Sequence, residues 1–393
     1  MYSVYQHWDP LKVCVVGRSY PPEFYSWITT PHVRNLMEKI AIETEEDYQG
    51  IIKKLQEFGV EILRPNFPKA KMSNGRYIPP PMTPRDHFIM IGQDFYAPKL
   101  LNYPDWKDFY KNIRGDSWPI EVESIQDLPE NLRQECIHVH GWDQSNVNVL
   151  ISTSTPSQEG IPLYDCYSDI INKIQSQGNP LKESTPGING AMVSRIGRDL
   201  YFGTQGRGGV HRSLEEMQRD ANDKFPNTRN HIVDTFGHAD GTYCPVCPGL
   251  IISLEEIRNY KQTFPDWEVV YLPNQSWYKV RPFMSLKQKN HGKWWIPGFE
   301  YDDQVIETIE TWLGHWTGYV EETVFDVNML IIDPKNVMVF NYNKQVFDAL
   351  DRYGITAHIV PFRHRYFWDG GIHCVTSDLH REGTMQDFFP NRL

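Results

Sequence analysis

The sequence predicts an α/β fold in which short ββαβ units are arranged radially around a closed centre, because one pattern of elements recurs along the chain. The first observation is a hairpin signal, which is two short apolar runs joined by a turn rich in Gly, Asp, Asn or Pro. It occurs over residues 84–97, 191–202 and 328–340. The second is a helical pattern followed by an apolar run, as at 345–353 and 356–360. No Pro/Gly/Ser-rich linker interrupts the sequence, so residues 1–393 are expected to form a single domain.

The start of the chain is expected to form a β-α-β unit. Residues 11–17 are a β-branched run closed by glycine and indicate a buried strand. Residues 43–58 have apolar side chains at helical spacing and acidic side chains in the first turn, and Gly59 ends this predicted helix. Residues 60–63 form the next predicted strand, which Pro65 ends. Further helices are predicted at 213–223 and 254–264, a strand at 268–272, and insertions at 100–127 and 276–298.

Composition and charge narrow the class of protein. Hydrophobic residues at 40% and charged residues at 23% are typical of a globular protein. The 50 acidic and 39 basic residues give a net charge of −11, which argues against nucleic acid or an anionic membrane as the main partner and favours a small molecule. The six cysteines are irregularly spaced and form no disulfide framework. With neither a signal peptide nor a membrane span in the sequence, we expect a cytoplasmic protein.

Cys374 is the candidate reactive residue. Gly370 and Gly371 precede it, and the missing Cβ atoms allow a sharp turn and close approach of a substrate to the sulfur. Polar residues follow at 376–378, where an apolar strand would be expected if Cys374 only filled a core. A free cysteine is also commonly a small buried apolar residue, so this stretch alone leaves both roles open.

Three further positions carry candidate chemistry. On an extended strand, alternation would place His238 and Asp240 on the same face, as a base beside an anion, although the flanking glycines also fit a surface turn. Asp86 stands at the start of a predicted hairpin, where it could face a ligand or cap a turn. Asn189, between two glycines, indicates only a loop when taken alone.

Two patterns resemble metal sites but lack the remaining ligands. Cys244 and Cys247 have CxxC spacing, yet the sequence has no second CxxC and no paired histidines to complete a zinc site, and prolines frame the pair as a turn. His138 and His140 could lie on one strand face, but no matching ligand cluster accompanies them. We therefore expect structural roles here and no metal.

Taken together, these motifs resemble the amidinotransferases of the guanidino-modifying (pentein) superfamily, in particular the arginine:glycine type. The resemblance runs nearly end to end. It rests on Pro-Arg-Asp at 84–86, Gly-Arg-Asp at 197–199, His-Ala-Asp-Gly-Thr at 238–242 and Gly-Gly-Ile-His-Cys-Val-Thr-Ser-Asp at 370–378. It implies a pentein fold, a five-fold pseudosymmetric α/β propeller of ββαβ modules around a central polar cavity.

The resemblance also implies a mechanism. Asp86 and Asp240 match the family's pair of carboxylates, which grip the N–H groups of a planar guanidinium cation. The Cys374 thiolate would attack the guanidinium carbon of L-arginine, and ornithine would leave. His238 would protonate the departing amine and later deprotonate an acceptor such as glycine. This chemistry requires no cofactor and no metal.

Some positions depart from the family. Asn189 stands where the family has an aspartate that orients the catalytic histidine, although an amide oxygen can still accept the imidazole N–H. Asp326 replaces a serine and would repel a substrate carboxylate, while Gly237 and Thr235 replace a methionine and an asparagine. Arg258 lies close to the position of a carboxylate-binding arginine.

Three functions remain open at this point. The first is an amidinotransferase that uses arginine and a small primary amine such as glycine. The second is an arginine hydrolase or deiminase of the same superfamily, and the third is a non-catalytic protein that binds guanidino compounds. The expected partners are small-molecule substrates, without nucleic acid or membrane, and a homodimer is compatible with the sequence.

Overall fold

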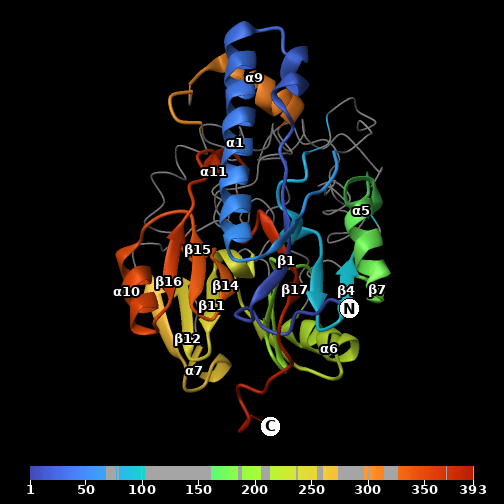
Figure 1. The fold of residues 1–393 in the computed structure, drawn as a ribbon, viewed down its shortest axis with the longest axis vertical. Coiled ribbons are helices and arrows are strands. Elements are labelled where there is room, and N and C mark those ends of the chain that lie inside the picture. Colours follow the sequence, from blue (N-terminus) through green and yellow to red (C-terminus); the bar gives the residue numbers. More distant parts are fainter. Residues whose placement is uncertain are drawn as a thin grey trace, which may run out of the picture.

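One three-stranded sheet is repeated around the molecule. The computed structural model describes residues 1–67, 77, 79–98, 100–101, 161–184, 188–204, 213–235, 238–254, 260–272, 296–299, 301–313, 326–368 and 370–392. Within these ranges, five three-stranded sheets share one plan: the middle strand pairs antiparallel with the first strand and parallel with the third. A helix connects the second strand to the third in each case (Figure 1). The predicted ββαβ unit is therefore confirmed.

We name each module by its first strand. The β3 module contains β3 (Ile89–Ile91), β4 (Asp94–Ala97), α5 (Leu163–Ser176) and β7 (Leu181–Glu183). The β8 module contains β8 (Val193–Ile196), β9 (Asp199–Gly203), α6 (Leu214–Lys224) and β10 (Arg229–Val233). The β11 module contains β11 (Tyr243–Cys247), β12 (Leu250–Leu254), α7 (Tyr260–Thr263) and β13 (Glu268–Leu272). The β14 module contains β14 (Leu330–Asp333), β15 (Asn336–Val339), α10 (Lys344–Arg352) and β16 (Thr356–Ile359).

The β17 module joins the two ends of the chain. It contains β17 (Thr376–Arg381), β1 (Leu11–Val16), α1 (Pro31–Glu57) and β2 (Glu61–Leu63). Here the antiparallel pair is formed by strands from opposite ends of the sequence, with Cys14 opposite Asp378. The ββαβ plan is thus completed without a local hairpin, and the last strand before the C-terminus becomes part of the same core as the first strand of the chain.

Three of the hairpin turns contain a glycine in the left-handed region. Gly92, Gly197 and Gly249 have φ values of 57°, 62° and 92°, which residues with a Cβ rarely adopt. The first two lie in hairpins that the sequence predicts. The third joins β11 to β12, a hairpin that the sequence analysis missed.

The interpretation of Cys244 and Cys247 as part of a turn is wrong. Both cysteines lie on strand β11, which pairs with β12, and both are buried in a hydrophobic cluster. Proline is tolerated in this strand because β11 is at the edge of its sheet. The structural role expected for the two cysteines is consistent with this packing.

Helix α1 begins well before the predicted start at residue 43. Pro31 occupies its first turn, where the missing N–H costs nothing. Glu43 and Asp47 consequently lie in the middle of the helix, where they contact a later segment of the chain. The Asp47 carboxylate accepts hydrogen bonds from the Arg363 backbone N–H at 2.6 Å and from its Nε at 2.9 Å. His364 Nε2 lies 2.6 Å from Glu43 Oε2.

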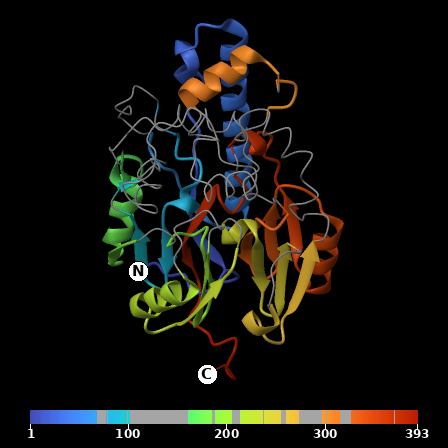
Figure 2. The same ribbon diagram turned by 180° about the vertical axis from the view of Figure 1, so that it is seen from behind.

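A few elements lie outside the five modules. They include the 3₁₀ helix η1 (Pro22–Trp27), the pair β5 (Leu100–Leu101) and β6 (Ile161–Pro162), α9 (Asp303–Thr308), the π-helical turn η7 (Ile309–Leu313) and α11 (Arg365–Trp368). In Figures 1 and 2, α1 rises above the sheets and α9 crosses its far end. Among the helices of the described residues, none combines the length and apolar composition needed to cross a bilayer.

A buried ionic cluster ties three parts of the chain together. The Asp378 carboxylate on β17 accepts hydrogen bonds from Arg85 at 2.5 Å, from Arg195 at 2.8 and 2.9 Å, and from Arg381 at 2.6 Å. All four residues are at most 1% exposed. Burial alone would raise the pKa of Asp378, but the guanidinium groups hold it well below its usual range.

This cluster corrects the expectation for residues 376–378. Strand β17 begins at Thr376, directly after the Cys374 loop, and its polar side chains are buried. Residues 376–378 are polar because this strand runs through a charged part of the core. As a result, the strand that follows Cys374 is fixed at the centre of the fold.

Candidate active site

The loops that precede the first strands of the five modules meet in a ring. They span residues 84–88, 188–192, 238–242, 326–329 and 370–375, and each is hydrogen-bonded to the next. The bonds run from Gly190 N to Arg85 O at 2.9 Å, Asp240 N to Ala191 O at 3.1 Å, Asn328 Nδ2 to Asp240 O at 3.2 Å, His373 N to Asn328 Oδ1 at 2.8 Å, and Arg85 N to Cys374 O at 3.4 Å. We call this arrangement the loop ring. It gathers the sequence-predicted residues Asp86, Asn189, His238, Asp240 and Cys374.

Cys374 lies in the loop ring and is 4% exposed. Its Sγ is 3.1 Å from Asn328 Nδ2 and 3.5 Å from Asp240 Oδ2. Burial, followed by the charges of Asp240 and Asp86, raises the pKa of the thiol well above its usual value. Without a nearby cation, Cys374 is therefore a neutral thiol at pH 7.

Asp240 lies in a 3₁₀ turn, Ala239–Gly241, and not on the extended strand that the sequence predicts. Its Oδ2 is 2.8 Å from His373 Nδ1. Burial raises the pKa of Asp240 to about 7; nearby His238 lowers it and Asp86 raises it. The other oxygen, Oδ1, is buried and accepts no hydrogen bond from the residues that the structure describes.

Asp86 ends a similar 3₁₀ turn, Pro84–Asp86, in front of β3. Its Oδ1 is 3.9 Å from His238 Nδ1 and, like Asp240 Oδ1, is buried without a hydrogen-bond donor among the described residues. The side chains of Asp86 and His238 are 25% and 16% exposed, so this side of the ring is the more open one. Two acidic side chains thus act on the Cys374 thiol, and the His238 imidazole lies beside one of them.

The known proteins to which this chain is similar include amidinotransferases. No protein-family model matches the chain. The chain is 26% identical over 427 residues to the mitochondrial glycine amidinotransferase of Xenopus laevis, covering 98% of this chain and 84% of that protein. Among solved structures, an amidinotransferase from Microseira wollei in the saxitoxin biosynthetic pathway matches with a TM-score of 0.58 at 16% identity, covering 99% of each chain.

The chain has the amidinotransferase fold. The inosamine-phosphate amidinotransferase of Streptomyces griseus also matches, with a TM-score of 0.56 at 15% identity over 99% of each chain. The predicted pentein propeller is therefore confirmed, with five modules whose loops form the ring. The cytoplasmic location and the oligomeric state stay predictions.

In this amidinotransferase fold, His373 makes contacts in the loop ring that the sequence did not predict. Its ring faces the Asp240 carboxylate, and burial, followed by the charges of Arg85 and His7, lowers its pKa well below the usual value. It is therefore a neutral imidazole that fixes the orientation of one carboxylate oxygen. Its position next to Cys374 in the sequence was the available signal.

The side chain of Asn189 takes part in a local turn. Its Oδ1 accepts hydrogen bonds from the backbone N–H groups of Ala191 and Met192, both at 3.0 Å. Both lone pairs of the amide oxygen are thereby used in a local turn. The expected acceptance of the His238 imidazole N–H would compete with these two bonds, and the orienting role stays a prediction.

Of the residues expected near the substrate's amino-acid end, the structure describes Asp326 and Thr235. Asp326 is 8% exposed, and its two oxygens accept hydrogen bonds from the side chains of Asn341 and Asn343. It therefore braces the connection between β15 and α10. Thr235 is buried, with its N–H donating to Thr204 Oγ1 at 2.9 Å. Arg258 and Gly237 lie outside the described residues, as do His138 and His140.

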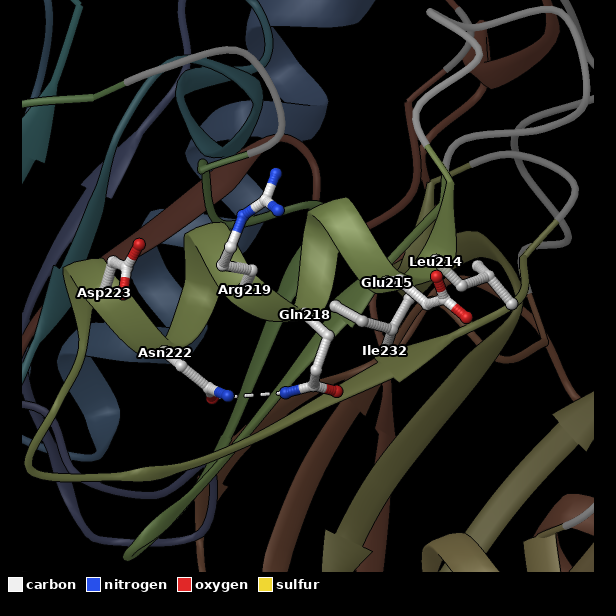
Figure 3. A pocket seen from close by; sticks show the side chains of 7 residues that line it. All are labelled: Leu214, Glu215, Gln218, Arg219, Asn222, Asp223 and Ile232. Carbon is white, nitrogen blue, oxygen red and sulfur yellow. Dashed lines mark hydrogen bonds between the residues drawn. The ribbon is translucent and has the colours of Figure 1, made fainter.

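A groove on the outer face of the β8 module is separate from the loop ring. It has a volume of about 620 Å³ and is lined by α6 together with Ile232 of β10 (Figure 3). Gln218 and Asn222, which both line it, are hydrogen-bonded to each other at 3.2 Å. Its lining has acids, amides, an arginine and aliphatic side chains, with no thiol or imidazole. The candidate reactive groups therefore lie in the loop ring and not in this groove.

The raised pKa of Asp240 predicts how activity depends on pH. A carboxylate binds a cation only when ionised, so kcat/KM for a cationic substrate should rise with pH through a midpoint of about 7. A bound cation lowers the pKa of Asp240, so the acidic limb of kcat should lie at lower pH than that of kcat/KM. Steady-state profiles of both parameters check this order. If the acidic limbs of the two profiles coincide, or if the limb of kcat lies at higher pH, this prediction is contradicted.

Proposed function

We propose that the protein is an amidinotransferase that moves the amidino group of L-arginine through a covalent amidino-Cys374 to a small primary amine such as glycine, releasing ornithine. The observation that carries this proposal is a pair of buried carboxylate oxygens, Asp86 Oδ1 and Asp240 Oδ1, that lack hydrogen-bond donors among the described residues beside a buried thiol. A planar cation with several N–H donors satisfies both oxygens at once.

Binding of the guanidinium changes the charge around the sulfur. The bound cation partly offsets the charge of the two carboxylates that raise the pKa of Cys374, so the thiol gives up its proton more readily, and His238 accepts it. The thiolate then attacks the guanidinium carbon and forms a C–S bond. As the C–N bond to the ornithine side chain breaks, His238 supplies the proton that the departing amine needs.

The second half of the reaction reverses these roles. An acceptor amine attacks the carbon of amidino-Cys374, a new C–N bond forms and the C–S bond breaks. His238 takes the proton from the attacking amine, and the thiolate is regenerated. The relatives named above support a primary amine as the acceptor, since one is named for glycine and another for inosamine phosphate.

A product assay tests this function. The protein is incubated with arginine and a panel of primary amines, and the products are identified by mass. We expect ornithine and a guanidino product in equal amounts, formed only when an amine is present. Ornithine with urea, or citrulline with ammonia, in the absence of an amine would identify a hydrolase and contradict transfer.

Neutralising either carboxylate should impair substrate binding without harming the fold. Asp240→Asn and Asp86→Asn are each expected to lower kcat/KM about 100-fold or more, because a desolvated charge pair with the guanidinium is lost. The thermal midpoint should stay nearly unchanged, since burial of Asp240 already favours its neutral form. Kinetics and thermal unfolding of both variants provide the check. A large drop in the midpoint with unchanged kcat/KM in the folded fraction would assign these residues to the fold instead.

A further inference from the structure

We infer that Asn328 is a further catalytic residue, whose side-chain amide donates a hydrogen bond to the sulfur of Cys374 and stabilises the thiolate. The inference rests on the proposed function, in which Cys374 is the nucleophile. Asn328 lies two residues before β14, as Cys374 lies two residues before β17, and Asp86 and Asp240 lie three residues before β3 and β11. The sequence analysis treated it only as the start of a hairpin.

The contacts of Asn328 fix the orientation of its amide. The side chain is buried, at 1% exposed, and makes four contacts. Its Oδ1 accepts from the backbone N–H groups of His373 at 2.8 Å and Cys374 at 3.3 Å. Because two N–H donors identify the oxygen, the amide nitrogen must face the other way. Its two hydrogens then point at the Asp240 carbonyl oxygen, 3.2 Å away, and at Cys374 Sγ, 3.1 Å away.

Gly371 supplies an independent observation. A Cβ built on Gly371 would lie 2.1 Å from Asn328 Oδ1 and 2.3 Å from its Cγ, far inside van der Waals contact. Only glycine at this position lets the nucleophile loop pack directly on the amide. The paired glycines before Cys374 therefore do more than allow a turn, because one of them makes room for Asn328.

The charges near the sulfur explain why this donor matters. Burial and the carboxylates of Asp240 and Asp86 all oppose the thiolate. The groups that favour it are the backbone N–H of Gly371 and the side chain of Asn328. His373 faces Asp240 as a neutral imidazole and adds no positive charge. The amide of Asn328 is thus a neutral donor that partly offsets two negative neighbours without competing with the substrate for their charge.

Asn328 also sets the distance between nucleophile and carboxylate. Its side chain provides both links of the β14 loop in the ring, one to the Asp240 carbonyl and one to the backbone of the Cys374 loop. The same amide therefore holds the sulfur and the turn that carries Asp240. Attack on a guanidinium carbon requires these two groups in a fixed relation.

The test separates the contact with sulfur from the contacts with the backbone N–H groups. Asn328→Asp keeps an oxygen for the His373 and Cys374 N–H groups but replaces the amide that donates to sulfur and to the Asp240 carbonyl by a carboxylate oxygen. Asn328→Ala removes all four contacts. Asn222→Asp is the matched control, because Asn222 is exposed and its Oδ1 accepts hydrogen bonds from Gln218 and Asn230, a role that aspartate keeps. Each protein is treated with iodoacetamide across a pH series, and alkylation of the peptide containing Cys374 is followed by mass spectrometry.

We expect Cys374 in Asn328→Asp to be alkylated at least about tenfold more slowly than in wild type at a given pH, as is expected when a hydrogen bond to a charged group is lost. Its amidination by labelled arginine in a single turnover should slow by a similar factor. Asn222→Asp should match wild type in both. The fold of Asn328→Asp, checked by thermal unfolding, should survive even if Asn328→Ala does not.

The outcomes distinguish the two proposals. If folded Asn328→Asp is alkylated and amidinated at wild-type rates, Asn328 serves only the backbone and this inference is wrong, while the proposed function stands. If alkylation slows as expected but wild type never acquires the amidino label, the thiolate role stands and the proposed function fails. Absence of both labels from wild-type Cys374 would overturn both.

Discussion

Cys374→Ser is expected to lose amidino transfer by a factor of about 10⁴ or more while keeping its fold. A serine hydroxyl does not ionise near neutral pH, so it is a far weaker nucleophile than a thiolate. The change replaces one atom of a side chain that is 4% exposed, and the Asn328 amide can donate to oxygen as it does to sulfur. Release of ornithine and the thermal midpoint are the two measurements.

Cys247→Ser provides the matched control for this variant. Cys247 is also a buried free cysteine, but it lies on β11 among apolar side chains. We expect full activity with a slightly lower thermal midpoint, because a hydroxyl replaces a thiol in an apolar site. If Cys374→Ser retains more than a small fraction of activity, or if Cys247→Ser loses it, the assignment of the nucleophile is wrong.

Asp378→Asn is expected to have the largest effect on stability. The change leaves three buried guanidinium groups, of Arg85, Arg195 and Arg381, without their shared carboxylate. Breaking a buried ion pair by removing one partner typically costs about 3–5 kcal/mol, which is a large part of the unfolding free energy of a domain. Urea unfolding at neutral pH measures the loss.

The pH dependence of this loss follows from the lowered pKa of Asp378. A carboxylate with a depressed pKa in the folded state stabilises the protein fully above its unfolded pKa of about 3.9, and this contribution disappears as pH falls through the folded value. The difference between wild type and Asp378→Asn should therefore be constant near neutral pH and shrink only in acid. Glu382→Gln, which removes an exposed ion pair with Lys12, should change stability little at any pH. A difference of similar size for both variants would contradict the buried cluster.

Local signals explain which parts of the fold could be predicted. The hairpins around Gly92 and Gly197 could be predicted because glycine, which readily adopts a positive φ, marks a turn in the sequence. Strand β17 and the start of α1 were missed because both depend on distant partners. Thr376, Ser377 and Asp378 form a strand opposite β1, more than 350 residues earlier in the chain, and three arginines compensate the charge of Asp378.

In the site, too, residues in local motifs could be predicted and residues defined by distant contacts could not. Cys374, His238, Asp86 and Asp240 could be proposed because each stands in a motif of distinctive residue types. His373 and Asn328 were missed because their contacts join separate modules: Asp240 is 133 residues from His373, and Asn328 is 46 residues from Cys374. Comparing equivalent positions before each hairpin would have singled out Asn328, since its loop precedes β14 as the Asp86 loop precedes β3.

The most direct test of the account is an acid quench during a single turnover. The protein is mixed with arginine labelled in its guanidino carbon, without an acceptor amine, then quenched, digested and analysed by mass. We predict that the label is carried as an amidino group on the peptide containing Cys374, and that an added amine removes it and acquires it. Transfer of the label to the amine with no adduct on Cys374 at any time would contradict the account.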